Sequence, residues 1–118
     1  MNKEQKEAIN VVTSEMYEIA AAHGFHATDG KKISVERMAI FCANLHGEVS
    51  ELWEATRKGT LGEPSDKNCG LTNGEEELAD IAIRVMDTAF SICVDLGLAI
   101  ELKAKYNSGR PFMHGKKA

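Results

Sequence analysis

The sequence has 118 residues and a formal net charge of −4, with 43% hydrophobic and 27% charged residues. This length and composition are typical of one globular domain and exclude a chain that is disordered throughout. The charge is uneven, because residues 1–100 carry a net −8 and residues 101–118 a net +4. An acidic body lacks the basic face that a general nucleic-acid binder needs. We expect a single helical domain over residues 1–118, with a basic C-terminal tail from about residue 108.

Three further features of the sequence indicate the cellular compartment of the protein. The most apolar stretch is interrupted by Asp87 and Asp95, so no run reaches the ~20 residues of a transmembrane helix. The first residues lack the apolar segment of a secretory signal. Cys42, Cys69 and Cys93 are odd in number and form no C-x-x-C pair, which favours buried, reduced thiols over a disulfide framework or a zinc site. We expect a cytoplasmic protein without a membrane partner.

Helical periodicity dominates the first half of the chain. Over residues 2–23, apolar side chains recur at steps of three and four, which predicts a first helix. Gly24 is a natural stop for it, and a loop through Gly30 is expected to follow. A second helix is predicted over residues 34–58, with Ser34 as its N-cap.

A long loop and two further helices are predicted in the second half. The loop covers residues 59–74, and connections of this length are often functional. The third helix begins with Thr72 or Asn73 as its cap and runs to a stop at Gly97. A short fourth helix is expected over residues 98–107. No stretch alternates like a strand, so the predicted fold class is all-α.

The third predicted helix is apolar on two sides. One side is a stripe of Leu78, Ile81, Val85, Ala89, Ile92 and Leu96, and the other is a patch of Ile83, Met86, Phe90 and Val94. A helix that is apolar on two sides is buried on two sides. One short chain offers few partners for both. We therefore expect a bundle of three long helices and a short C-terminal helix, completed by homo-oligomerisation as a dimer or tetramer with this helix at the interface.

Two pairs of carboxylates lie three residues apart on the second and third predicted helices: Glu48 with Glu51, and Glu77 with Asp80. This spacing places both members of a pair on one helix face. Four carboxylates beside a core repel one another, and a divalent cation is the usual resolution. Oxygen ligands alone suit Mg²⁺ or Mn²⁺ rather than zinc. The spacing is also compatible with a salt-bridged surface, which stays open as the alternative.

The residues around these carboxylates resemble a known family. LHGEVSELWEA at residues 45–55 and ELADIAIR at residues 77–84 give the order E-x-x-E, linker, E-x-x-D. This order is similar to that of the all-α nucleoside triphosphate pyrophosphohydrolases of the MazG-like type. The tail over residues 103–117 is similar to the ending of short, single-domain members. The resemblance covers about residues 8–117.

The resemblance implies hydrolysis of a (d)NTP between its α- and β-phosphates, giving (d)NMP and pyrophosphate, with a role in sanitising the nucleotide pool. It implies that Mg²⁺, or Mn²⁺ in its place, is held by four catalytic carboxylates: Glu48, Glu51, Glu77 and Asp80. Which group acts as the general base stays open. The alternative is a non-enzymatic helical binding or regulatory module, in which these carboxylates hold a structural cation or pair with Arg and Lys.

Substrate-binding candidates follow from the same resemblance. Arg84 lies one turn after Asp80 and is a candidate for the distal phosphates, the alternative being a salt bridge to Asp80. Three further phosphate candidates lie in the basic C-terminal region: Lys103, Asn107 and Arg110. For these, a solvated helix face or tail is the alternative. Phe25 and His26 follow the first helix, where relatives often have an aromatic pair, and are expected to stack on the base.

Overall fold

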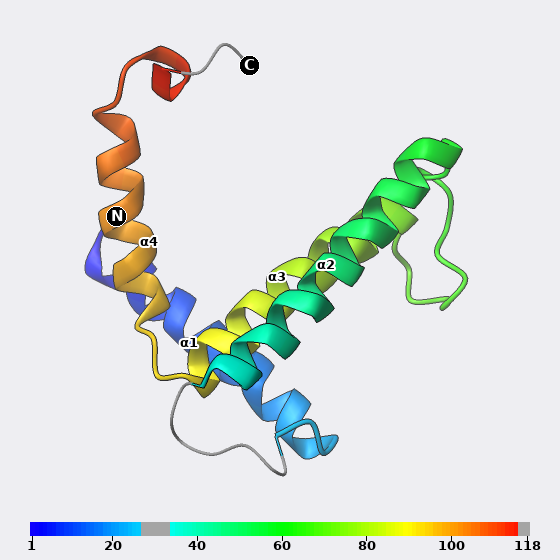
Figure 1. Cartoon of the computed structure of the whole chain (residues 1–118), viewed down its shortest axis with the longest axis horizontal. Helices are drawn as coiled ribbons and strands as arrows, with labels where there is room; N and C mark the ends of the chain where they lie inside the picture. The colour runs from blue at the N-terminus through cyan, green and yellow to red at the C-terminus, as the bar shows by residue number, and fades with distance from the viewer. Residues whose placement is uncertain (27–33, 116–118) are drawn as a thin grey trace.

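The computed structural model describes residues 1–26 and 34–115, so the predicted loop through Gly30 and the last lysines of the basic tail lie outside the described residues. Within these ranges the chain forms helices and no strand, which confirms the all-α prediction. The elements are α1 (Lys3–Ala22), α2 (Val35–Lys58), α3 (Asn73–Ser91), α4 (Leu96–Ser108) and a 3₁₀ turn, η1 (Phe112–Gly115) (Figure 1). None of the described helices combines the length and apolar character needed to cross a membrane.

Side-chain caps determine where the first three helices begin. At α1, the Asn2 side chain accepts a hydrogen bond from the Gln5 backbone, and the Gln5 side chain accepts one from Asn2. Thr72 and Glu75 form the same reciprocal pair at α3. Ser34 caps α2. Because such caps depend on a few adjacent residues, the predicted helix starts are confirmed to within a residue.

The third helix ends earlier than predicted. α3 stops at Ser91, and Gly97 lies in the first turn of α4 rather than at the end of α3. Cys93 turns the chain between them with a φ of 62°. The Asp95 side chain caps α4 and accepts a hydrogen bond from the side chain of Asn10 on α1, at 2.9 Å. The hydrogen bond between Asn10 and Asp95 joins two helices far apart in sequence. It accounts for the start of α4 before the point to which apolar periodicity extends α3.

α2 and α3 form a long antiparallel hairpin (Figure 1). α1 packs against α3 near the end of the hairpin where α2 begins, and α4 packs mainly against α1. α4 then leads away from the hairpin, so that the 3₁₀ turn lies far from the tip where α2 ends and α3 begins (Figure 1).

The three cysteines are free, but the prediction that they are buried is wrong for the single chain. Cys42, Cys69 and Cys93 are all exposed. Cys42 lies on α2, which packs on α3 along one side, while Cys69 and Cys93 lie in the two connections that flank α3.

Little of the apolar surface is buried within one chain. Ala89 is the one apolar side chain among the described residues that is buried. Several large apolar side chains of the hairpin are exposed, among them Val35, Ile40, Trp53, Leu78 and Ile83. The accessible surface is 8,684 Å², whereas a compact monomer of this mass exposes about 6,300 Å². The radius of gyration of 16.5 Å also exceeds the value of about 13.5 Å for a compact domain of this length.

Candidate metal centre

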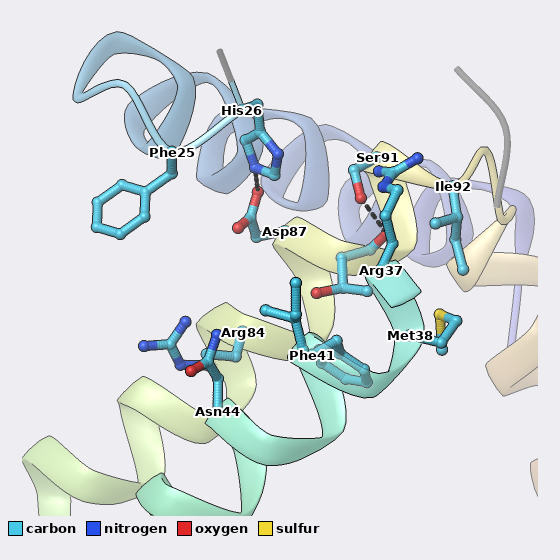
Figure 2. A pocket seen from close by; sticks show the side chains of 12 residues that line it. Phe25, His26, Arg37, Met38, Phe41, Asn44, Arg84, Asp87, Ser91 and Ile92 are labelled. Atoms are coloured by element: carbon cyan, nitrogen blue, oxygen red, sulfur yellow. Dashed lines mark hydrogen bonds and ion pairs between the residues drawn. The ribbon is translucent and has the colours of Figure 1, made fainter. Parts of the chain in front are cut away.

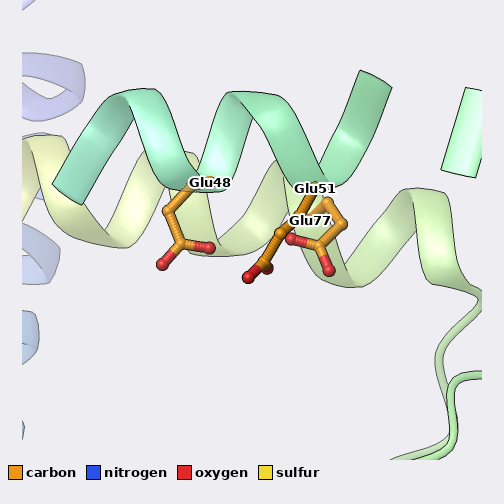
Figure 3. Close-up of side chains that lie close together, drawn as sticks. All are labelled: Glu48, Glu51 and Glu77. Carbon is orange, nitrogen blue, oxygen red and sulfur yellow. The ribbon is translucent and has the colours of Figure 1, made fainter. Parts of the chain in front are cut away.

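Carboxylates from α2 and α3 converge on one side of the hairpin (Figure 3). Glu48, Glu51 and Glu77 each place a carboxylate oxygen within 4.8 Å of the others. Glu76, Glu77 and Asp80 form a second group within the same limit, so Glu77 belongs to both. The antiparallel hairpin thus sets E-x-x-E opposite E-x-x-D. The four predicted ligands are brought together, and Glu76 is a fifth carboxylate that the sequence spacing does not single out.

Glu77 is the most enclosed of these groups. Glu77 is only 9% exposed, and its Oε2 is buried without a hydrogen-bond partner. Burial, together with the hydrogen bond and the negative charge of Glu51, raises the pKa of Glu77 to about 7. A buried oxygen without a partner is costly, and a bound cation would satisfy it.

Burial and repulsion also affect Asp80, the other predicted ligand on α3. Burial, and after it the charge of Glu48, raises the pKa of Asp80. Repulsion between neighbouring carboxylates is relieved by a proton or by a cation. The potential ligand atoms that converge here are all carboxylate oxygens, and Mg²⁺ and Mn²⁺ prefer oxygen ligands. The residues present therefore fit the predicted ion.

Arg84 reaches the cluster from α3. Its Nε donates a hydrogen bond to Oε1 of Glu48 at 3.0 Å, so it crosses to α2 rather than pairing with Asp80 on its own helix. The Arg84 side chain is about one-third exposed and also borders two neighbouring cavities. Arg84 thus lies beside the candidate ligands, and its partner is Glu48 rather than Asp80, the partner considered as the alternative.

Two side chains of the loop before α3 bind the carboxylate of Glu76, which lies on α3 itself. Lys67 pairs with Oε1 of Glu76, and the Ser65 hydroxyl donates to Oε2 at 2.6 Å. These two contacts lower the pKa of Glu76, in contrast to its neighbour Glu77. Sequence reasoning missed Ser65 and Lys67, because no periodicity links residues of an irregular loop to a helix face.

A cavity of about 330 Å³ adjoins the carboxylates. Glu48, Asp80 and Arg84 border it on one side, and apolar side chains of α1 such as Met16 border it on the other. Phe25 also lines it and is 71% exposed. A second cavity of about 140 Å³ shares Phe25, Arg84 and Asp87 with the first (Figure 2). Apolar and charged walls thus meet next to the cluster.

The His26 ring contacts two other side chains of the protein, Asp87 and Tyr17. Its Nε2 lies 2.5 Å from Oδ1 of Asp87 on α3 (Figure 2), and its ring stacks on Tyr17 with the ring centres 4.5 Å apart. Tyr17 in turn contacts Phe90, at 4.7 Å between centres. One face of the His26 ring is therefore covered, and of the two predicted base-stacking residues Phe25 has the larger exposed surface.

The predicted phosphate-binding residues of the C-terminal region lie apart from the carboxylates in the single chain. Lys103 and Asn107 belong to α4 and Arg110 follows it, in the part of the chain that leads away from the hairpin (Figure 1). Lys103 Nζ lies 4.6 Å and Arg110 Cζ 5.6 Å from the centre of the Tyr106 ring. These two cations thus meet an aromatic ring of their own segment.

Comparisons of the chain with models of known protein families, with curated proteins and with solved structures found no match.

Proposed function

We propose that this protein is a Mg²⁺-dependent nucleoside triphosphate pyrophosphohydrolase of the MazG-like type, which hydrolyses a (d)NTP to (d)NMP and pyrophosphate and helps to sanitise the nucleotide pool. The observation that carries the proposal is the convergence of Glu48, Glu51 and Glu77 within 4.8 Å, with Oε2 of Glu77 buried and unpartnered. The order of the two motifs along the chain supports it.

The chain's residues have distinct proposed roles. Glu48, Glu51, Glu77 and Asp80 would hold Mg²⁺, or Mn²⁺ in its place, and the bound ion would neutralise phosphate charge and activate water. Without a cation this acidic surface would repel a triphosphate, which carries nearly four negative charges. Arg84 would exchange Glu48 for a phosphate oxygen, because a guanidinium binds phosphate strongly.

The adjoining cavity would receive the nucleoside. It lies between the acidic groups and the apolar side chains of α1, and its volume of about 330 Å³ falls within the range of small-molecule sites. The exposed ring of Phe25 would stack on the base.

We also propose that the protein is a homo-oligomer, either a dimer or a tetramer. The surface in excess of a compact monomer, about 2,400 Å², is comparable to the area that obligate subunits bury. The exposed apolar side chains of the hairpin supply a face for such contact.

The enzymatic proposal is tested by incubating the protein with a panel of (d)NTPs and Mg²⁺ and by measuring pyrophosphate and orthophosphate separately. We expect pyrophosphate from at least one nucleotide, its loss on removal of the metal, and a rate lowered by about a hundredfold in Glu51→Gln. Glu54→Gln is the matched control, because Glu54 lies one turn further along α2 and pairs with Arg57 and Lys58 instead.

Three outcomes would count against the proposal. No pyrophosphate from any nucleotide, or full activity of Glu51→Gln, would reject the enzyme. Orthophosphate in place of pyrophosphate would retain a hydrolase but reject cleavage at this bond.

A non-enzymatic module with a structural cation is the second candidate. The observation that favours it is that protein cations already meet two of the carboxylates, Arg84 at Glu48 and Lys67 at Glu76. Such a module would bind Mg²⁺ and leave every nucleotide of the panel intact.

A further inference from the structure

The loop between α2 and α3 contributes two side chains that engage both oxygens of one carboxylate. Ser65 Oγ donates to Oε2 of Glu76 at 2.6 Å, and the Lys67 ammonium donates to Oε1. Ser65 Oγ also accepts a hydrogen bond from the backbone nitrogen of Lys67 at 3.2 Å, so the two loop residues support each other. Ser65 and Glu76 are both more than nine-tenths buried.

Backbone hydrogen bonds hold this loop against the start of α3. The Ser65 nitrogen donates to the Leu71 carbonyl, and the Asn73 nitrogen donates to the Glu63 carbonyl, each at 2.9 Å. The position of Lys67 is thus set by ordered backbone on both sides of it, and not by its long side chain alone.

Glu76 lies among the candidate metal ligands. Its carboxylate is within 4.8 Å of those of Glu77 and Asp80, so an unpaired Glu76 would add a negative charge to the centre and compete as a ligand. Lys67 neutralises that charge, and with Ser65 it uses both oxygens. The contact between Arg84 and Glu48 differs, because it engages a single oxygen of a carboxylate that faces Glu51 and Glu77.

We infer that Ser65 and Lys67 form a clasp that keeps Glu76 out of the metal-binding set. Lys67 is then a positioning residue that limits both the number of carboxylate ligands and the negative charge at the centre. The inference rests on the proposed metal centre and adds a control on its affinity. Loss of Lys67 frees Glu76, so divalent cations bind more tightly, whereas damage to a merely structural contact would weaken binding or leave it unchanged.

The inference is tested by titrating the protein with Mn²⁺ at about pH 8 and following free Mn²⁺ by electron paramagnetic resonance. We expect Lys67→Ala to bind about fivefold more tightly and Lys67→Arg, which keeps the charge, to stay within about twofold of wild type. Glu76→Gln should bind about fivefold more weakly, because Lys67 then adds an uncompensated positive charge. The double variant, which removes the neutral pair, should return to within about twofold of wild type.

The double variant separates a clasped Glu76 from a ligating one. If it binds about tenfold more weakly than wild type, Glu76 is a ligand and the inference is overturned. Lys67→Ala that keeps its helical circular dichroism but binds no more tightly also overturns it. Should Lys67→Ala lose that signal, the double variant, which leaves no buried charge unpaired, still tests the inference, because binding about tenfold weaker than wild type would make Glu76 a ligand. Wild type that binds no Mn²⁺ contradicts the proposed function itself, whereas wild-type binding without the effect of Lys67 contradicts the clasp alone.

Discussion

Glu77 combines burial, an unpartnered oxygen and a raised pKa in a single side chain. Its pKa is about 7 in the folded protein and lies near the ordinary value of 4.5 in an unfolded chain. The metal-free fold therefore favours the protonated carboxyl. Its contribution to stability is fully present below about pH 4.5 and is lost as the pH rises through about 7.

Metal binding should accordingly be coupled to release of this proton. Below pH 7 the ion must displace it, so the apparent Mn²⁺ affinity should rise by up to about tenfold per pH unit from about pH 5.5 and level off above pH 7. Titrations in a series of buffers measure this slope. Glu77→Gln removes the titrating group and should bind weakly with a much flatter slope. An affinity of wild type that is independent of pH across this range would contradict the assignment of Glu77 as a ligand.

Arg84 should influence metal and nucleotide in opposite directions. Because it neutralises Glu48, Arg84→Ala should bind Mn²⁺ about threefold more tightly, while the KM for the triphosphate should rise about tenfold through loss of a phosphate contact. Arg57→Ala is the control, since Arg57 pairs with Glu54 at 2.7 Å on the same hairpin. An unchanged KM in Arg84→Ala would remove Arg84 from the substrate site.

Helical spacing places the members of each carboxylate pair on one helix face, but other pairs in the sequence share that spacing, and it is the family resemblance that singles out Glu48, Glu51, Glu77 and Asp80 as candidate ligands. A carboxylate pair at i and i+3 faces one way wherever the helix lies, and the hairpin then opposes the two pairs. The clasp of Ser65 and Lys67 and the contact of His26 with Asp87 are not predictable in this way. Both join a helix to an irregular segment, whose path depends on tertiary packing.

Among the helices, boundaries set by local chemistry are predicted well and boundaries set by packing are not. Ser34 and Thr72 begin their helices through bonds to backbone three residues away. The break between α3 and α4 depends on Asp95, which bonds both to its own helix start and to Asn10 on α1. The periodicity of apolar residues contains no information on the contact with Asn10. A prediction from periodicity therefore extends α3 to Gly97, beyond its end at Ser91.

Gly97 allows the close approach of α4 to α1. A Cβ at this position would lie 2.5 Å from the Lys6 carbonyl oxygen and 3.2 Å from the side chain of Asn10. Gly97→Ala should therefore lower the free energy of unfolding by about 1–3 kcal/mol, measured by urea denaturation. Gly62→Ala, where a Cβ would meet nothing within 4 Å, should leave it nearly unchanged. A stabilised Gly97→Ala, as helix propensity alone would give, would contradict this packing.

The single chain as a whole is more extended than a compact domain, with a radius of gyration of 16.5 Å. Its net charge of −4 is the average of an acidic body and a basic C-terminal region. Part of the acidic charge is concentrated in the carboxylate cluster of the hairpin. An acidic protein of this kind can bind an anion, provided that a cation mediates the contact.

Light scattering should give a mass that is a multiple of the 12.9 kDa chain at micromolar concentration. Leu78→Lys, on α3 and 59% exposed, should shift the protein toward the monomer, because a charge in an apolar interface is costly. Val11→Lys, on α1 and 56% exposed, is the matched control. A monomeric wild type would contradict the proposed oligomer, and dissociation by Val11→Lys alone would move the interface to α1.

The sharpest test of a divalent metal centre between α2 and α3 is anomalous scattering from crystals grown with Mn²⁺. The geometry predicts a peak bounded by Glu48, Glu51, Glu77 and Asp80. Glu76 should remain on Ser65 and Lys67. Crystals that hold Mn²⁺ elsewhere but show no peak among these carboxylates would contradict the metal centre and the hydrolase built on it.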